Sequence, residues 1–410
     1  MEKTIKKKIL IVSQHFYPEN FKINDFCSEL IKKGNDLTIL TGKPNYPIGK
    51  FYKGYSFFST HKESFEGVKI IRVPVIARGD GSSFKLFLNY LSFAFFGSLF
   101  TLFHRKKYDF SFVFAISPIT AAIPAIISRI FYGNKMVLWV LDLWPESLYV
   151  TGRLRSSILR KLLLSLVKFI YNQSDKIFIS SQSMKASILD KLKPEHAKEI
   201  YYMPNWAEET FFEEIIDTNK YLPLMPNGFK IMFAGNIGSG QDIPSLLKAA
   251  IILKKTSNVK FIIIGDGYLK KYLIDQIEEL KLNDTVYYLG SFPLKEMKNF
   301  YFHADVMMLS LRDESIYSYT VPGKLQGYLA SQKVVAAMIN GESNEIIKKA
   351  SCGIAVNAEN YTEFANELLI LSKMRASTLE KMKKNGLKYY QNNFKKKTIV
   401  NSFLEKVSDL

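Results

Sequence analysis

Short apolar runs alternate with helical stretches along this chain of 410 residues, and the alternation occurs twice. The first run precedes a helical pattern at Asn24–Lys33, which Gly34 ends. Because parallel strands need crossover helices, the pattern predicts a doubly wound α/β fold with helices on both faces of a parallel sheet. The strands predicted in the first half are Ile9–Ser13, Leu37–Leu40, Val68–Val73, Phe110–Ala115, Met136–Val140, Lys176–Ser180 and Ile200–Met203.

Residues 204–228 interrupt the alternation with three prolines and are predicted to form a linker. They separate a first domain at 1–203 from a second at 229–395, and residues 396–410 are expected to pack back across the domains. Two such domains predict a ligand cleft between them, beyond the carboxyl ends of the strands. The strands predicted in the second half are Lys230–Ala234, Val259–Ile264, Thr285–Leu289, Val306–Leu309, Val334–Ala337 and one near Ile354. The helices predicted there are Ile243–Lys254, Tyr268–Leu280, Leu294–Tyr301, Gly323–Ala330, Glu342–Ala350 and about Ala376–Asn393.

Positive charge is concentrated in the first half of the chain. Residues 1–205 hold 30 basic and 15 acidic side chains, whereas residues 206–410 hold 26 and 23, within a net charge of +18. The asymmetry predicts an anionic partner for the first half, which could be nucleic acid, anionic lipid or a phosphorylated ligand. General solubility in a lysine-rich proteome is the alternative that composition leaves open.

One segment, Leu86–Phe103, is almost wholly apolar and lies between Lys85 and a basic run at 104–107. Its 18 residues only reach the minimum length of a membrane span. Its polar residues do not align on one helical face, so we expect a buried helix or one that dips into a membrane surface. The flanking basic residues favour the second.

Composition excludes several kinds of site. The 47% hydrophobic content rules out extensive disorder. Cys27 and Cys352 are the two cysteines, which excludes a disulfide scaffold and a cysteine zinc site and fits a reducing cytoplasm. The apolar run Ile9–Val12 is too short for a signal-peptide core, so no secretory signal is expected. No two aspartates lie two positions apart and the five histidines are scattered, so no metal site is predicted.

Loops after the first two predicted strands hold polar and aromatic side chains that could bind a substrate. The candidates include a histidine and a glutamate near a helix start. They also include a lysine that could contact an anion and a tyrosine that could stack on a sugar ring. The competing interpretations are that the histidine is structural, that Glu19 and Lys22 are ordinary surface residues of a first helical turn, and that the second loop is only a proline-stiffened turn. The candidates are His15, Glu19, Lys22, Lys43, Asn45 and Tyr46.

Asp142, Trp144 and Glu146 follow the apolar strand Met136–Val140. Carboxylates and an aromatic face at a strand end are typical of a carbohydrate site. Ordinary helix-start chemistry after Pro145 is the alternative. We favour function, because Asp142 would otherwise be an unpaired carboxylate beside a hydrophobic strand.

Glycine-rich turns in the second half could bring backbone N–H groups to a phosphate. Their spacing fits neither the dinucleotide fingerprint nor a Walker loop. A later helix start with Pro322, Gly323 and Lys324 could bind a diphosphate, although a proline-capped helix with a solvated lysine is the competing interpretation. The residues of these segments are Gly235, Asn236, Gln241, Asp266, Gly267, Tyr319, Thr320, Val321, Pro322, Gly323 and Lys324.

Several segments in this order resemble the GT-B glycosyltransferases of glycosyltransferase family 4, over essentially the whole chain. The chain is most similar to the bacterial group that includes the N-acetyl-L-fucosaminyltransferases of O-antigen, capsule and colanic-acid synthesis. The matching segments are Ser13–Glu19, Thr41–Pro47, Asp142–Ser147, Ala234–Gly238 and Val321–Lys324.

The resemblance implies two Rossmann-like domains and a retaining transfer that needs neither metal nor cofactor. It implies a nucleotide-sugar, UDP-linked, in the second domain and a polyprenyl-diphosphate-linked saccharide in the first. The protein would then work at the cytoplasmic face of the cell membrane, on an anionic lipid surface. Ser291 and Phe292, after the strand that ends at Leu289, would help hold the base.

The chain also departs from the family pattern. Uncharged Asn236 and Gln241 occupy a loop where many members have an arginine and a lysine. The family's Glu-x7-Glu pair falls on Tyr319 and Gly327. Lys324 and the backbone of Thr320–Gly323 must therefore carry more of the phosphate binding.

These residues together predict a sugar transferase in which Asp142, Glu146 and Glu19 orient the acceptor hydroxyl and steady positive charge on the donor sugar. Two other classes stay open. A sugar-nucleotide 2-epimerase uses the same fold without an acceptor. A nucleic-acid-binding protein would use the positive charge, but no basic, aromatic-interleaved module is present, so no nucleic-acid partner is expected.

Overall fold

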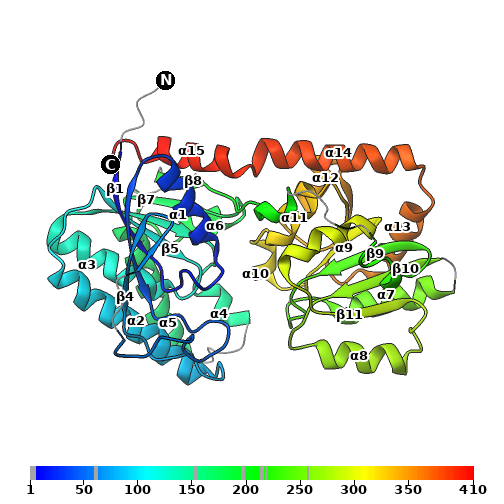
Figure 1. Ribbon diagram of the computed structural model, residues 1–410, viewed down its shortest axis with the longest axis horizontal. Helices are drawn as coiled ribbons and strands as arrows, with labels where there is room; N and C mark the ends of the chain where they lie inside the picture. Colours follow the sequence, from blue (N-terminus) through cyan, green and yellow to red (C-terminus); the bar gives the residue numbers. More distant parts are fainter. Residues whose placement is uncertain are drawn as a thin grey trace. The chain divides into compact units, whose positions relative to one another are not determined.

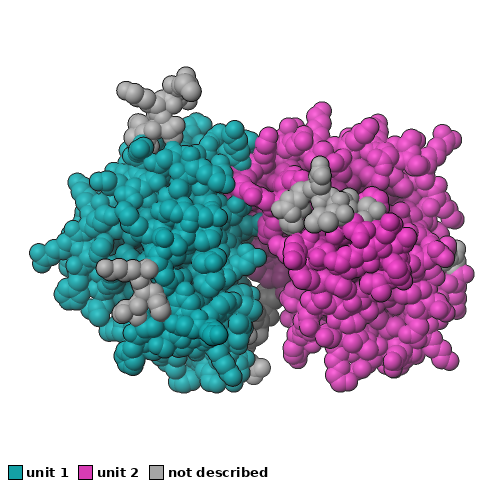
Figure 2. Space-filling model, in the orientation of Figure 1, with its two compact units in different colours: residues 1–204, 397–410 teal, residues 205–396 magenta. Residues whose placement is uncertain are grey.

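The computed structural model describes residues 6–59, 63–150, 156–194, 199–212, 217, 219–255 and 258–410. The chain divides into two compact units (Figure 2), and each has its own sheet. The first unit comprises Met1–Pro204 and Lys397–Leu410, and the second comprises Asn205–Lys396.

A twisted sheet forms the centre of the first unit, and its described strands run in the order β3-β4-β2-β1-β5-β6-β7-β8 (Figure 1). Neighbouring strands are parallel except for the pair β3–β4 at one edge, which is antiparallel. The chain order reverses beside β1, so the loops that follow β1 and β2 lie at the same carboxyl edge. The strands are β1 Lys8–Val12, β2 Asp36–Gly42, β3 Glu63–Phe65, β4 Val68–Val73, β5 Phe110–Ala115, β6 Lys135–Val140, β7 Lys176–Ile179 and β8 Ile200–Tyr202.

Helices cover both faces of this sheet. Phe112 of β5 lies 5.0 Å, centroid to centroid, from Phe26 of α1 and 5.2 Å from Phe403 of α15. Leu40 of β2 points to the opposite face and lies beside Gly97 of α2. The helices of this unit are α1 Lys22–Lys32, α2 Ser83–Phe103, α3 Ile123–Tyr132, α4 Glu146–Val150, α5 Ser157–Gln173, α6 Met184–Leu189 and α15 Lys396–Lys406.

The second unit is built on a parallel sheet whose described strands run β11-β10-β9-β12-β13-β14. The chain passes outward from β9 to β11 and then returns to the other side of β9 as β12. This reversal leaves a crevice at the carboxyl end of β9, where open α/β sheets bind ligands. The strands are β9 Phe229–Ala234, β10 Val259–Ile264, β11 Val286–Gly290, β12 Val306–Ser310, β13 Val334–Met338 and β14 Gly353–Val356.

Alternating side chains of these strands enter two hydrophobic clusters. Met232 and Ile264 face α9, α11, α12 and α14, whereas Phe233 and Ile263 face α7, α8 and α13. Both faces of the sheet are therefore buried, as near-continuous apolar strands require. The helices are α7 Ile243–Lys254, α8 Lys270–Glu279, α9 Met297–His303, α10 Ser315–Ser318, α11 Gly323–Ala330, α12 Glu342–Ala350, α13 Tyr361–Ser372 and α14 Ala376–Asn393.

The predicted α/β class with two doubly wound sheets is confirmed, and the predicted strands lie within two residues of the observed ones at each end. No bounds were predicted for α3 to α6, and the short edge strand β3, helix α10 and helix α13 were not predicted. The start of α13 carries a readable signal, because the side chain of Asn360 accepts a hydrogen bond from the backbone N–H of Glu363.

Two segments complete the description of the units. The described part of the predicted linker packs onto the second unit, where the ring of Tyr221 stacks on Phe300 with centroids 3.9 Å apart. Residues 213–216 and 218 of that linker lie outside the described residues. Residues 397–410 belong to the first unit, where Lys176 Nζ donates to Asp409 Oδ1 over 2.7 Å.

Candidate functional site: a pocket in the second unit and polar loops in the first

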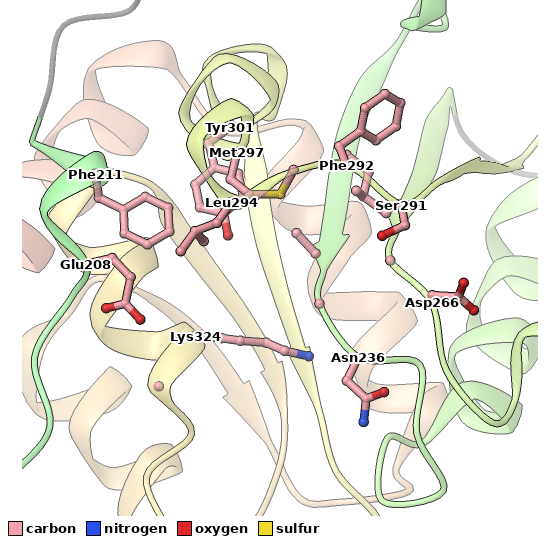
Figure 3. A pocket seen from close by; sticks show the side chains of 15 residues that line it. Glu208, Phe211, Asn236, Asp266, Ser291, Phe292, Leu294, Met297, Tyr301 and Lys324 are labelled. Atoms are coloured by element: carbon pink, nitrogen blue, oxygen red, sulfur yellow. The ribbon is translucent and has the colours of Figure 1, made fainter. Parts of the chain in front are cut away.

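A pocket of about 440 Å³ lies at the carboxyl edge of the second unit's sheet (Figure 3). The loops after β9, β10 and β11 and the start of α11 line it. Seven of the residues predicted to bind the donor meet there: Gly235, Asn236, Asp266, Ser291, Phe292, Gly323 and Lys324.

Two glycines allow these loops to approach one another. Gly235 has a φ of +139°, and a Cβ there would lie 2.5 Å from Lys324 Cε. Gly265 has a φ of +144°, and a Cβ there would lie 1.8 Å from the carbonyl oxygen of Gly235. Both positions therefore need glycine for conformation and for space, and the lysine lies directly over the turn.

Lys324 is the cation of this pocket. Its Nζ lies 3.9 Å from the centroid of the Phe233 ring and donates to Gln241 Oε1 over 3.2 Å. Desolvation by burial lowers the pKa of Lys324 to about 7. A bound anion would favour the charged form of the lysine. Gln241 does not line the pocket but acts on it through Lys324.

Asp266 and Gly267 form the turn after β10. Asp266 Oδ1 accepts from the N–H of Gly267 over 2.8 Å, and its Oδ2 lies 3.4 Å from Lys270 Nζ. Asp266 lines the pocket, whereas Gly267 packs against Asn236 and Ile237.

Tyr319, Thr320, Val321 and Pro322 lead into α11 without lining the pocket. The side chain of Val321 is buried in the hydrophobic cluster, so only its backbone could serve a ligand. The carbonyl of Thr320 accepts from Ser343 Oγ over 3.4 Å, which fixes the chain before the helix starts.

In the first unit, His15 and Glu19 form a buried pair with His15 Nδ1 and Glu19 Oε2 2.8 Å apart. The other oxygen, Glu19 Oε1, accepts from the backbone N–H groups of Asn45 (2.7 Å) and Tyr46 (2.6 Å). Glu19 is only 2% exposed. Its carboxylate ties the loop after β1 to the loop after β2, which is a positioning role; its contact with an acceptor stays a prediction.

Two further candidates in these loops bond within the protein. Lys43 is buried and its ammonium donates to the carbonyl of Ser59; desolvation, with Arg72 nearby, lowers its pKa. Asn45 is also buried; its side chain donates to the carbonyl of Lys43 and accepts from the N–H of Arg78. Their acceptor-binding roles stay predictions.

Tyr46 keeps the surface that the prediction requires. Its ring is partly exposed, tilts against His15 and Phe21, and lies under the guanidinium of Arg78 at 4.8 Å. Lys22 begins α1 after Phe21. An aromatic ring with one open face suits stacking on a sugar.

Asp142 follows β6, two strand positions from β1. No described side chain forms an ion pair or hydrogen bond with its carboxylate, and burial raises its pKa to about 7. A carboxyl group of this kind can hold or accept a proton near neutral pH.

Glu146 and Trp144, which follow Asp142 in sequence, make contacts within the protein. Glu146 Oε1 accepts from the buried Lys191 Nζ and from Ser187 Oγ, the latter over 2.9 Å. Trp144 is 5% exposed, and its Nε1 and Glu146 Oε2 are buried without a hydrogen-bond partner among the described residues. The acceptor roles of Glu146 and Trp144 stay predictions.

Comparison with known proteins finds a family match within the second unit. Residues 219–389 match the family described as Glycosyl transferases group 1. The chain is 32% identical over 231 residues to the probable glycosyltransferase WbjE of Pseudomonas aeruginosa, an alignment that covers 54% of this chain and 56% of that protein. It is 24% identical over 265 residues to the N-acetylgalactosamine-N,N'-diacetylbacillosaminyl-diphospho-undecaprenol 4-alpha-N-acetylgalactosaminyltransferase of Campylobacter jejuni, covering 63% of this chain and 60% of that protein. The chain thus spans about half the length of the curated relatives it matches.

Solved structures of glycosyltransferases share the fold over the full chain. Anabaena Alr3699/HepE in complex with UDP and glucose superimposes with a TM-score of 0.69 and 14% identity, covering 98% of this chain and 100% of that chain. Sucrose-phosphate synthase from Thermosynechococcus elongatus gives a TM-score of 0.73 and 15% identity, covering 98% of both chains. The fold of this chain is GT-B.

The family match covers most of the pocket, but eight lining residues were not predicted to bind the donor. Three lie at the ends of β9 and β10 and in the turn after β10. Glu208 and Phe211 come from the stretch read as a linker, and the other three come from the 3-10 turn Leu294–Glu296 and from α9. Phe211 takes the space above Gly327, where a Cβ would lie 3.0 Å from the Phe211 ring. The full set is Glu208, Phe211, Ala234, Ile264, Gly265, Leu294, Met297 and Tyr301.

No group of three or more His, Cys, Asp and Glu side chains that could hold a metal ion occurs among the described residues.

Proposed function

We propose that this chain is a glycosyltransferase that moves a sugar from a nucleoside-diphosphate donor to a lipid-linked saccharide, without metal and with retention at the anomeric carbon. The proposal assigns the donor to the pocket of the second unit and the acceptor to the loops of the first. The observation that carries it is Lys324, a desolvated ammonium over the Gly235 turn.

A diphosphate leaving group explains the pocket. When the bond between the anomeric carbon and the diphosphate oxygen breaks, the oxygen keeps the electron pair and negative charge develops on it. Lys324 and the free N–H groups at the start of α11 stabilise that charge in place of a cation. Asn236 lines the same pocket and can donate to a phosphate oxygen, and Gln241 holds the lysine.

The acceptor hydroxyl attacks the anomeric carbon on the face that the diphosphate leaves, as retention requires, and its proton passes to the Asp142 carboxylate as the new bond forms. Asp142 is assigned to accept a hydrogen bond from that hydroxyl, because no described residue pairs with its carboxylate and its pKa lies near 7. His15, held by Glu19, and the ring of Tyr46 are assigned to the acceptor saccharide.

The relatives support finer assignments. A UDP complex is known for the similar Anabaena structure, which favours a UDP-linked donor. The Campylobacter relative is named for a diphospho-undecaprenol acceptor, which favours a polyprenyl-diphosphate-linked saccharide. Together with the family resemblance, these favour transfer of an N-acetylated deoxyhexose such as FucNAc in bacterial O-antigen or capsule synthesis. The cytoplasmic face of the cell membrane, where nucleotide-sugars meet lipid-linked saccharides, is the proposed location.

A thermal-shift panel with UDP, GDP, dTDP and their sugars tests the donor assignment. At a ligand concentration of about 100 times Kd, binding stabilises the native state by about 2.7 kcal/mol, so a bound diphosphate raises Tm clearly. Uridine, which has no diphosphate, serves as the control and should shift Tm little. If no nucleoside diphosphate shifts Tm more than its nucleoside does, the donor assignment is wrong. Conversion of a nucleotide-sugar without any acceptor would instead indicate the epimerase.

A further inference from the structure

Helix α2 is the one helix among the described residues long and apolar enough to cross a membrane, and its polar side faces the protein. Asn89 Oδ1 accepts from Gln14 Nε2 over 2.6 Å, and Asn89 Nδ2 donates to the carbonyl of Ile76, also over 2.6 Å. Ser92 Oγ accepts from the N–H of Ile76 over 2.9 Å. These contacts bind α2 to the loops at the carboxyl edge of the first unit's sheet.

The opposite side of α2 is an unbroken apolar stripe. Its members recur every three or four residues, so they lie along one face of the helix over about 28 Å, at 1.5 Å of rise per residue. All of them are exposed large apolar side chains, a reversal of the pattern on a helix that covers a protein core. The stripe consists of Phe84, Phe87, Leu91, Phe95, Leu99 and Phe103.

Neighbouring helices extend this surface. Helix α3 packs on α2, where Gly97 faces Pro124, and it exposes Ile130 and Phe131 at its end. Helix α5 contacts α3 and exposes four more apolar side chains. Those of α5 are Ile158, Leu159, Leu162 and Phe169. An exposed apolar surface of this extent marks an interaction site.

Positive charge surrounds the stripe. No aspartate or glutamate occurs within α2, α3 or α5. Lys85 near the start of α2 pairs with exposed Asp80 over 3.3 Å, whereas exposed Arg105 and Lys107 follow the end of the helix. Exposed Lys161 and Lys168 lie on α5. Each lysine or arginine near an anionic membrane adds about 1 kcal/mol of attraction, so the charge and the apolar stripe favour the same partner.

We propose that α2, with the ends of α3 and α5, inserts its apolar stripe into the headgroup region of an anionic bilayer, parallel to the membrane plane. The inference deepens the proposed function by naming the surface through which the first unit reaches a lipid-linked acceptor. A membrane-spanning role would strip Asn89 and Ser92 of their partners in the loops. A second copy of the chain would place two acid-free, basic surfaces against each other.

Vesicle co-sedimentation tests the proposal on the full chain without any nucleotide. We expect the protein to bind vesicles of 30% phosphatidylglycerol in phosphatidylcholine and to bind pure phosphatidylcholine at least tenfold more weakly. The double variant Phe87→Ser/Phe95→Ser should lose at least tenfold in binding to the anionic vesicles. Its side chains are 58% and 60% exposed, so folding should be unaffected.

The matched control is Phe302→Ser/Ile370→Ser in the second unit, whose side chains are 49% and 51% exposed. It should bind vesicles as the parent does. Equal binding by the parent and the α2 variant, or equal loss in the control, would overturn the proposal.

Insertion is separated from adsorption by fluorescence. The three tryptophans, Trp139, Trp144 and Trp206, are buried. A Phe95→Trp variant therefore introduces an exposed tryptophan that can report on contact with lipid. Brominated lipids should quench it strongly and should leave the control Phe302→Trp unquenched. No added quenching of Phe95→Trp, or a parent dimer in sedimentation that Phe87→Ser/Phe95→Ser makes monomeric, would contradict bilayer insertion. Because UDP binding is measured without vesicles, either proposal can fail alone.

Discussion

The pocket of the second unit and the polar loops of the first differ in how many of their polar side chains already form hydrogen bonds or ion pairs within the protein. In the pocket, Lys324 has lost hydration without gaining a carboxylate partner. In the loops, Glu19, Lys43 and Glu146 all make contacts within the protein, although Glu146 Oε2 is buried without a hydrogen-bond partner among the described residues. The comparison teaches that residue type at a strand end does not identify a binding group; unused hydrogen-bonding or charge capacity does. By that measure, Asp142 is the residue of the first unit that most resembles Lys324.

The largest effect should come from removing the ammonium of the pocket. We expect Lys324→Met to weaken UDP binding by about 3–4 kcal/mol, since a buried cation facing a diphosphate is lost. Calorimetric titration measures the effect. Folding should be at least as stable as in the parent, because the native state disfavours the charge.

Lys271→Met is the matched control, since its ammonium is exposed and pairs with Asp275 over 2.8 Å. UDP affinity of Lys324→Met within threefold of the parent would show that the comparison misassigns the pocket.

Asp142 should match Lys324 in importance while acting on a different step. We expect Asp142→Asn to lower the rate of transfer at saturating donor by about 100-fold, the loss typical of a group that handles a proton. UDP affinity should be unchanged, because the residue lies in the first unit. The rate is measured with a lipid-linked acceptor, and Asp190→Asn at the exposed end of α6 is the control. A rate near that of Asp190→Asn would leave the first unit without an identified acceptor group.

Glu146 and Asp142 both follow β6, but substitutions of the two carboxylates should have different effects. Glu146→Gln should lower the free energy of unfolding by about 2 kcal/mol, because Lys191 is buried and loses its ionic partner. The transfer rate should change less than twofold. Urea unfolding measures the first, and Glu146→Gln/Lys191→Met should recover part of the lost stability. A tenfold loss of rate at parental stability would return Glu146 to the catalytic group.

Donor affinity should depend on pH through Lys324. The free lysine has a pKa of about 7, and a bound diphosphate raises it, so binding takes up a proton above pH 7. Affinity should be greatest below pH 7 and should fall by up to tenfold, about 1.4 kcal/mol, for each pH unit above it. Titration calorimetry in two buffers of different ionisation enthalpy measures the proton uptake. Lys324→Met should show no such uptake; a pH-independent affinity in the parent would refute the low pKa.

The sequence predicts what depends on local order along the chain. Asp142 directly follows a strand and Lys324 starts a helix, so the strand–helix alternation places both at carboxyl edges without any tertiary information. The structural roles of Glu19 and Glu146 depend on partners that are distant in sequence. Glu19 bonds the N–H of Asn45, 26 residues away, and Glu146 meets Lys191, 45 residues away. No periodicity shows such pairs.

The stretch read as a linker illustrates the same limit. Prolines and the absence of periodicity correctly exclude a long helix there, but its packing depends on one feature of another element. Gly327 leaves room for the ring of Phe211, and this contact brings Glu208 to the pocket. The sequence signal for this packing is a glycine in the middle of α11, and it can be interpreted only once Phe211 is known to contact it.

The smallest predicted effect concerns Glu208, which can be compared with Lys324 in the same pocket. Its carboxylate lines the same cavity as Lys324 and can accept hydrogen bonds from ribose hydroxyls. Glu208→Gln should weaken UDP binding by about 1 kcal/mol, roughly fivefold, through the loss of a charged acceptor. Binding of inorganic diphosphate should instead stay equal or tighten, because a negative charge leaves the pocket and no ribose is present.

Glu209→Gln, one residue along and exposed, is the control and should leave both affinities unchanged. Parallel losses for UDP and diphosphate would mean that Glu208 shapes the pocket without contacting the nucleoside. Opposite responses would separate nucleoside recognition by Glu208 from diphosphate recognition by Lys324.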